Sequence, residues 1–284
     1  MALHEICYQG SQVAFLTQHG KQELVQSPLE QSLGCQVIHT DAFDTDQLGT
    51  FTGDILRQGT QLEAARKKAH IGMALTGLEI GLSSEGAFGG GPFAGFIPWD
   101  TEILLWVDKI NDLEIVGLAQ GPAQSHQKKI QSHDELIQFA DEAKFPEHFL
   151  VVRPDHRDHE EIIKGIKDKT DLIRAFDSAK AKSSSGMVFV ENDLRAFANP
   201  TRKDLIRKAT ENLIQKISSQ CPKCDAPAFW LDRYIPGMPC SKCGAKTHVP
   251  IAEVWFCSKC ENTEERPVNQ GSRADPGRCD ICNP

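Results

Sequence analysis

Eight of the ten cysteines fall in the last quarter of the 284-residue chain, where they form four pairs with one spacing. Two residues separate the members of each pair, so that one tight turn can aim both sulfurs at a single metal ion. Four thiolates make a closed tetrahedral zinc site that leaves no position for a substrate. We therefore predict two structural zinc ions, held by Cys221, Cys224, Cys240, Cys243, Cys257, Cys260, Cys279 and Cys282.

The spacing of the pairs leaves open which pairs share an ion. Fifteen residues separate the first two pairs and 18 separate the last two, and both gaps suit a short hairpin. The simpler arrangement is sequential, with Cys221 to Cys243 on one ion and Cys257 to Cys282 on the other. An interleaved arrangement is the alternative. Either would supply on the order of 10 kcal/mol of folding energy to a segment with few apolar residues.

The aromatic side chains of the cysteine-rich segment allow two interpretations. They can form the small core of the ribbons, or they can stack on the bases of a nucleic acid. The simpler role of the cysteine-rich segment is a structural one, in which zinc only stabilises the fold. Recognition of a nucleic acid or of a protein partner is the alternative. These residues are Phe229, Trp230, Tyr234, Trp255 and Phe256.

A second set of chemically capable residues lies upstream, in a stretch that starts at Gly59. Gly59-Thr60-Gln61-Leu62-Glu63-Ala64-Ala65-Arg66-Lys67-Lys68-Ala69 resembles the metal-binding helix of the inosine triphosphate pyrophosphatase superfamily, Gly-Thr-x-x-Glu-Asn-Ala-x-x-Lys-Ala. The matching positions include Thr60, Glu63 and Lys68, whereas Ala64 replaces the usual asparagine. Thr60 and Glu63 also have the spacing of a helix capping box, which is the structural interpretation of the same residues.

Three other segments resemble that superfamily in the same order along the chain. Leu16 to Lys21 is similar to the loop after its first strand, although His19 and Gly20 depart from it and the spacing is one residue shorter. Ile80 to Gly86 is closest to the inosine/xanthosine triphosphatase branch, and Asn199 to Arg202 opens a helix as that branch does. The whole chain, zinc pairs included, also resembles a bacterial family of unknown function with C-terminal zinc ribbons.

The resemblance implies a Mg²⁺-dependent hydrolase that converts noncanonical nucleoside triphosphates to monophosphates and pyrophosphate. Mg²⁺ prefers carboxylate oxygens, so Glu63 and Glu85 would hold the ion, and one of them could activate the attacking water. The phosphates would be bound by Lys21, Lys68, Thr201 and Arg202. Taken singly, each of these residues also fits an ordinary structural role, such as a solvated charge or a helix cap.

The elements that must position these residues alternate between strands and helices. Short apolar runs predict strands, and amphipathic stretches with capping residues predict helices. Two neighbouring strands, 103–107 and 113–118, are expected to pair in an antiparallel hairpin, which makes the sheet mixed. Residues 86–98 are expected to be a loop. The remaining predicted strands are 13–16, 35–38, 79–83, 149–152 and 187–190, and the predicted helices are 22–33, 60–77, 132–143, 168–182 and 201–217.

These patterns predict an α/β fold with two domains. Residues 1–218 would form a mixed-sheet, nucleotide pyrophosphatase-like domain, and residues 219–284 would form tandem zinc ribbons. The turn-rich segment from Asp41 to Asp54 has no counterpart in the resembled superfamily and could add metal ligands or close over a substrate.

The charge and the first residues of the chain limit the classes of partner. The net charge is −8, and residues 219–284 carry eight basic and eight acidic side chains, so a nucleic-acid partner is not favoured. No apolar run reaches the roughly 20 residues of a membrane span, and the N-terminus has no export signal, so a cytoplasmic location is expected. The rival functions are a non-catalytic nucleotide- or nucleic-acid-binding protein and a zinc-ribbon interaction scaffold.

Overall fold

The computed structural model describes residues 8–18, 20–48, 59–91 and 97–284. The chain divides into two compact units, which we name the core unit, residues 8–214, and the ribbon unit, residues 215–284. The division falls inside one helix, α5 (Pro200–Ser218). No described helix is both long enough and apolar enough to cross a membrane. Cys7, part of the Asp41–Asp54 segment and His19 lie outside the described residues.

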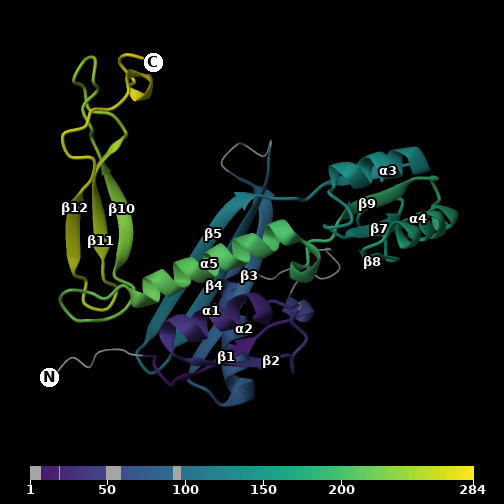
Figure 1. Ribbon diagram of the computed structural model, residues 1–284, viewed down its shortest axis with the longest axis horizontal. Coiled ribbons are helices and arrows are strands. Elements are labelled where there is room, and N and C mark those ends of the chain that lie inside the picture. The colour runs from purple at the N-terminus through teal and green to yellow at the C-terminus, as the bar shows by residue number, and fades with distance from the viewer. Residues whose placement is uncertain (1–7, 19, 49–58, 92–96) are drawn as a thin grey trace. The chain divides into compact units, whose positions relative to one another are not determined.

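The first sheet of the core unit has five strands in the order β2-β1-β3-β4-β5 (Figure 1). Strand β1 pairs in parallel with both β2 and β3, whereas β3, β4 and β5 pair antiparallel. The sheet is therefore mixed, as predicted. Its strands are β1 (Gln12–Leu16), β2 (Gln36–Thr40), β3 (Ile80–Gly90), β4 (Pro98–Asp108) and β5 (Leu113–Pro122).

Two helices make the parallel connections of this sheet. Helix α1 (Gln22–Leu33) joins β1 to β2 and ends at Gly34, and α2 (Gln61–Thr76) joins β2 to β3. The start of α2 is the predicted capping box, because Thr60 and Glu63 bond each other's backbone N–H groups. Its end is also as predicted, since Gly77 takes the left-handed conformation with φ of 72°. A short 3-10 helix, Thr45–Leu48, lies between β2 and α2 in the chain.

Small residues on both α2 and β3 let the helix lie close to the sheet. A Cβ on Gly81 of β3 would lie only 2.6 Å from the sulfur of Met73, so a larger residue there would push the helix away. The apolar core between α2 and the sheet consists of Ala14, Ala65, Ala69, Met73, Ile103, Leu105 and Val107.

Strands β3 and β4 are longer than the sequence pattern predicts. The expected loop at 86–98 is wrong for residues 86–90, which continue β3, and for Pro98, which begins β4 and pairs with Gly90. The glycines there suggested a turn, but extended backbone accepts glycine when the neighbouring strand completes the ladder. In this extension Gly86 pairs with Glu102 and Phe88 pairs with Asp100.

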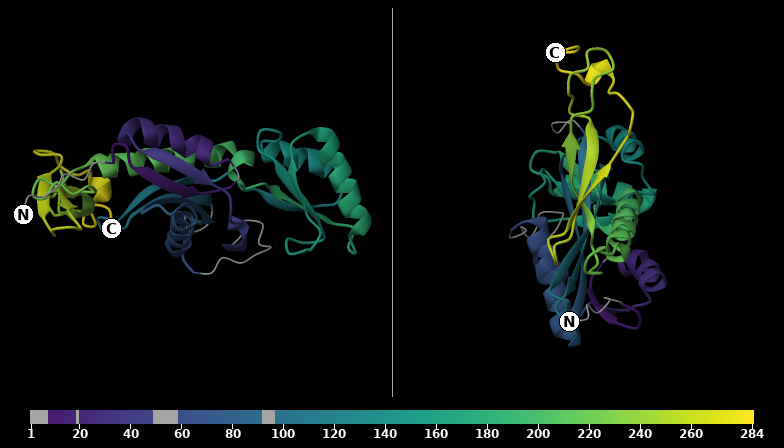
Figure 2. Two further views of the ribbon diagram at one scale, coloured as in Figure 1. Left: turned by 90° about the horizontal axis from the view of Figure 1, so that it is seen from below. Right: turned by 90° about the vertical axis from the view of Figure 1, so that its left-hand side faces the viewer.

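A second sheet of four strands completes the core unit, in the order β6-β9-β7-β8. Two helices cover one face of it, and their apolar residues form a separate core with alternate residues of β7 and β9 (Figures 1 and 2). Strands β6 and β8 were not predicted, because four-residue edge strands carry little pattern. The elements are β6 (Gln127–Ile130), α3 (His133–Glu142), β7 (Leu150–Pro154), β8 (Ile163–Ile166), α4 (Lys169–Lys182) and β9 (Val188–Asn192), with a 3-10 turn at Ala196–Ala198.

The ribbon unit contains one antiparallel sheet with the order β10-β11-β12 (Figure 1). Its strands are β10 (Trp230–Pro236), β11 (Pro250–Phe256) and β12 (Thr263–Pro267), and a 3-10 turn spans Pro276–Arg278. The sequence pattern predicted hairpins between cysteine pairs but not the bounds of these strands. They decide which cysteine pairs meet.

Candidate functional site

The eight cysteines form two separate clusters of four sulfurs, and within each cluster all ligand atoms lie within 4.8 Å of one another. Cys221 and Cys224 join Cys257 and Cys260, whereas Cys240 and Cys243 join Cys279 and Cys282. The ligation is therefore interleaved, and the sequential arrangement taken as simpler in the sequence analysis is wrong.

The strand order of the ribbon unit explains the interleaving. Because the three strands are antiparallel, the start of β10 lies at the same end of the sheet as the β11–β12 connection. The first and third cysteine pairs lie at this end, and the second and fourth lie at the other. A strand of seven residues is roughly 23 Å long, so consecutive pairs cannot reach one ion.

In each cluster, two sulfur–sulfur distances match those of a tetrahedral zinc site. At a Zn–S distance of about 2.3 Å, tetrahedral ligands are about 3.8 Å apart. The Sγ–Sγ distances are 3.7 Å for Cys221–Cys260 and for Cys224–Cys257. In the other cluster they are 3.9 Å for Cys240–Cys282 and 3.6 Å for Cys243–Cys279. Both clusters thus suit a closed, structural zinc site.

Three of the four cysteine turns share one backbone design. The residue after the second cysteine has positive φ, and its N–H donates to the carbonyl of the first cysteine. Asp225, Gly244 and Glu261 occupy this position, with φ of 58°, 76° and 57°. The turn leaves the N–H of Lys223 3.4 Å from the sulfur of Cys221, and that of Lys242 3.4 Å from Cys240, so backbone dipoles support the thiolates.

Four of the residues predicted for phosphate and metal chemistry meet in the core unit. Lys21 follows β1 and donates from Nζ to the carbonyl oxygen of Ser84 at 3.1 Å and to its hydroxyl at 3.2 Å. Lys68 from α2 forms an ion pair of 2.5 Å with the largely buried Glu85 in the middle of β3. The charges of Lys68, Glu85 and Arg202 all act on Lys21. Residues far apart in sequence therefore form one buried charge cluster.

Two carboxylates that the sequence analysis missed complete the cluster. Glu102 is fully buried, and its Oε1 accepts a 2.5 Å bond from Nε of Arg202, which also donates to the carbonyl oxygen of Leu194. Asp100 lies two residues earlier on β4 and is 1% exposed. We name the charge cluster by its six members: Lys21, Lys68, Glu85, Asp100, Glu102 and Arg202.

Burial and crowding change the acidity of two members of the charge cluster. Burial, with a further contribution from Arg202, lowers the pKa of Lys21 to about 7. Burial, followed by the charge of Glu102, raises the pKa of Asp100 to about 8. Both groups therefore change their protonation near neutral pH, which ordinary lysines and aspartates do not.

The remaining two predicted residues lie in other surroundings. Glu63 is exposed, and its Oε2 accepts bonds from the N–H of Thr60 at 2.7 Å and from the Thr60 hydroxyl at 2.9 Å. The bond from the Thr60 N–H, and then that from its hydroxyl, lower the pKa of Glu63. Thr201 opens α5 with its hydroxyl 2.9 Å from Nε2 of His148. Glu63 thus serves its own helix cap here, and its predicted role as a Mg²⁺ ligand stays a prediction.

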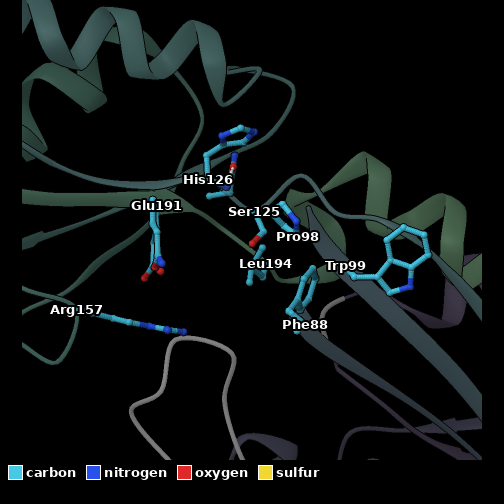
Figure 3. A pocket seen from close by; sticks show the side chains of 11 residues that line it. Phe88, Pro98, Trp99, Ser125, His126, Arg157, Glu191 and Leu194 are labelled. Atoms are coloured by element: carbon cyan, nitrogen blue, oxygen red, sulfur yellow. Dashed lines mark hydrogen bonds between the residues drawn. The ribbon is translucent and has the colours of Figure 1, made fainter. Parts of the chain in front are cut away.

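A pocket of about 380 Å³ adjoins the charge cluster, lined from both sheets of the core unit. Figure 3 shows Phe88 and Leu194 facing Glu191 and Arg157 across this space, with His126 nearby. The ring of Phe88 also lies beneath the guanidinium of Arg202, 5.8 Å from its carbon. The pocket therefore combines an aromatic wall with charged and hydrogen-bonding groups.

The comparisons with known proteins identify one family. The family described as a domain of unknown function, DUF6671, matches residues 68–284, which is most of the chain, and the chain belongs to it. No curated protein and no solved structure matches the sequence.

Proposed function

We propose that this member of the DUF6671 family is a Mg²⁺-dependent hydrolase of noncanonical nucleoside triphosphates that releases pyrophosphate. The observation that carries the proposal is the convergence of Lys21, Lys68, Glu85 and Arg202 in one buried charge cluster. Each of these residues comes from a different segment that resembles the inosine triphosphate pyrophosphatase superfamily. If the four resemblances were accidental, their residues would not be expected to lie together in the fold.

The place of the cluster in the sheet supports phosphate binding. The chain leaves β1 toward β2 on one side and returns past β1 to β3 on the other, so the two parallel neighbours of β1 are reached in opposite directions. Ligands of open α/β sheets bind beside the carboxyl ends of the strands at such a switch point. Lys21 follows the carboxyl end of β1, and Glu85 lies beyond it in register. Three cationic side chains lie there that could bind the oxygens of a triphosphate.

Of the two predicted Mg²⁺ ligands, Glu85 and Glu63, only Glu85 lies in the charge cluster. Glu85 offers a carboxylate inside the cluster, while Glu63 would first have to release Thr60. Mg²⁺ bound at these residues would neutralise charge on the phosphates during cleavage. Lys68 would exchange its bond with Glu85 for a phosphate oxygen, and the freed carboxylate could accept a proton from the attacking water. Lys21 and Arg202 would orient the remaining phosphate oxygens.

The pocket beside the cluster suits the nucleoside. Phe88 offers a ring face for stacking on a base, and His126, Glu191 and Arg157 offer hydrogen-bonding groups for its edge. A volume of about 380 Å³ lies within the usual size of small-molecule pockets.

A second candidate function is nucleotide binding without hydrolysis. The observation that favours it is that both predicted Mg²⁺ ligands are already engaged, Glu85 by Lys68 and Glu63 by Thr60. Such a protein would bind triphosphates through the same cations and leave them intact.

A panel of noncanonical nucleoside triphosphates with Mg²⁺ distinguishes the two functions. Pyrophosphate release is measured for the wild type, for Glu85→Gln and for Glu114→Gln, whose carboxylate pairs with Arg66 away from the cluster. We expect Glu85→Gln to lower the rate by about 100-fold or more, and Glu114→Gln to leave it unchanged. Release that is absent in the wild type, together with measurable triphosphate binding, would support the second function. Equal release by all three proteins would contradict the hydrolase proposal.

A further inference from the structure

We propose that Asp100 and Glu102 form a binding site for a hard divalent cation, separate from the predicted ligands Glu63 and Glu85. Both side chains are almost completely buried, with exposures of 1% and 0%. One oxygen of each, Oδ1 of Asp100 and Oε2 of Glu102, has no hydrogen-bond partner within the described part of the chain. A buried carboxylate oxygen without a partner is costly, and a bound cation would remove that cost.

The strand geometry brings the two carboxylates within reach of one ion. Asp100 and Glu102 are separated by one residue on β4, so both project from the same face of the sheet about 6.7 Å apart at the backbone. The charge of Glu102 acts directly on Asp100, which places the two groups in one electrostatic neighbourhood. Carboxylates that approach from neighbouring positions on one strand can converge on a shared ligand.

The residues paired with Asp100 and Glu102 on the neighbouring strands offer these carboxylates no hydrogen-bonding side chains. The residues paired with Asp100 are Phe88 on β3 and Gly121 on β5. Those paired with Glu102 are Gly86 and Ala119. None of these four has a polar side chain, and three are glycine or alanine. Water or a small ion is therefore the natural source of the missing contacts.

The atoms around Glu102 are closely packed at Gly86 of the neighbouring strand. A Cβ built there would lie 2.3 Å from Oε1 of Glu102 and 2.6 Å from Nη2 of Arg202. Only glycine at this position leaves the carboxylate and the guanidinium their present arrangement. A side chain large enough to replace a bound ion is therefore excluded from the neighbouring strand.

The chemistry of the donors selects the class of cation. Two carboxylates with no sulfur or imidazole in the set favour Mg²⁺, Mn²⁺ or Ca²⁺ over zinc, and water would complete the coordination. Arg202 pairs with Oε1 of Glu102, so Oε2 of Glu102 and Oδ1 of Asp100 stay available as ligands for a cation. The inference concerns cation binding alone and does not depend on nucleotide hydrolysis.

Titration of the zinc-loaded full chain with MnCl₂, followed by electron paramagnetic resonance of free Mn²⁺, tests the proposal. A first arm uses Glu85→Gln, which removes the other predicted carboxylate site, and we expect it to retain one Mn²⁺ that Mg²⁺ displaces. The double variant Glu85→Gln/Asp100→Asn should bind that ion roughly 10-fold more weakly or not at all. Unchanged binding by the double variant, or no Mn²⁺ on Glu85→Gln, would overturn the proposal.

Asp108 on the same strand provides a matched control. It is also 1% exposed, but its oxygens already accept bonds from Tyr8, Ile110 and Asn111. Glu85→Gln/Asp108→Asn should therefore bind Mn²⁺ as Glu85→Gln does, and an equal loss in this variant would refute the assignment. If Asp100→Asn does not fold, anomalous scattering from wild-type crystals grown with MnCl₂ gives the answer. A manganese peak at Asp100 and Glu102 supports the site, and its absence refutes it.

Discussion

The ribbon unit and the core unit both enclose several charged groups, but they neutralise them differently. The ribbon unit gathers four thiolates at each of two points and suits an external ion at each. The core unit gathers three carboxylates and supplies lysine and arginine partners from β1's loop, α2 and α5. Two separate apolar cores stabilise this unit. A small unit can thus be held by an ion it captures, whereas a large unit can carry an internal charge cluster because its cores stabilise the fold.

The largest effect should follow removal of zinc. Chelation should unfold the ribbon unit and leave the core unit folded, because metal contributes about 10–16 kcal/mol to structural thiolate sites, whereas the core unit has its own apolar cores. Residue-resolved hydrogen exchange before and after chelation measures the two units separately. If the amides of β10–β12 stay protected after complete zinc removal, the prediction that only the ribbon unit depends on zinc is contradicted.

Paired substitutions give the control for this experiment and test the interleaving. Cys221→Ser with Cys257→Ser disables one cluster, so one zinc per chain should remain. Cys221→Ser with Cys240→Ser damages both clusters and should leave none. Sequential ligation would reverse the two results, and zinc content measured by mass spectrometry distinguishes them.

A smaller effect is expected when the core unit loses one internal counter-ion. Arg202→Met should destabilise the chain by about 3–5 kcal/mol, because it leaves Glu102 buried without its cationic partner. Arg207→Met on the same helix removes an exposed pair with Asp204 and should cost at most about 1 kcal/mol. Urea unfolding monitored in the core unit measures both. Equal losses of stability in the two variants would mean that the buried Arg202–Glu102 pair contributes no more to stability than an exposed ion pair.

The packing around the cluster should be sensitive to a single methyl group. Gly86→Ala should cost about 1–3 kcal/mol, because the added Cβ collides with Glu102 and Arg202. Gly89→Ala on the same strand meets no heavy atom within 4 Å and should be neutral or slightly stabilising. Thermal unfolding of the two variants provides the comparison, and a neutral Gly86→Ala would show that the cluster can relax.

A last expected effect is a pH dependence of the stability of the core unit. In the folded state the pKa of Asp100 is raised to about 8, so its contribution is present at acid pH and is lost as the pH rises from about 4 to 8. The pKa of Lys21 is lowered to about 7, so its contribution grows as the pH rises from about 7 to 10.5. Unfolding free energies in magnesium-free buffer should therefore fall and then rise.

Single substitutions separate the two contributions to this curve. Asp100→Asn should flatten its acidic limb, and Lys21→Met should flatten its alkaline limb. A curve that both variants leave unchanged would show that neither group titrates as described.

The sequence predicted best the features that local patterns determine. The capping box at Thr60 and the left-handed Gly77 fixed both ends of α2, because each depends only on residues within one turn. The zinc ligands followed from spacing in the same way, but their partners did not. Their pairing depends on three strands whose residues alternate weakly between buried and exposed.

The charge cluster shows the same limit. Lys21, Lys68, Glu85 and Arg202 were proposed from a resemblance, whereas Asp100 and Glu102 were overlooked because β4 was expected to begin at Ile103. The alternation from Asp100 through Glu102 to Leu104 and Trp106 was a usable signal, since it places two acids on the same face of the strand as two buried apolar residues. Sequence patterns suggested which residues have chemistry, and strand register decided which of them meet.

The interleaved cysteines also determine how this region can be inherited. With sequential ligation, a recombination point between Cys243 and Cys257 would leave a complete zinc site on each side. Here a break at that point divides both clusters, and a break anywhere else between Cys221 and Cys282 divides at least one. Neither half can be duplicated, deleted or transplanted alone, so the two sites must pass together, as a single module, from one gene to another.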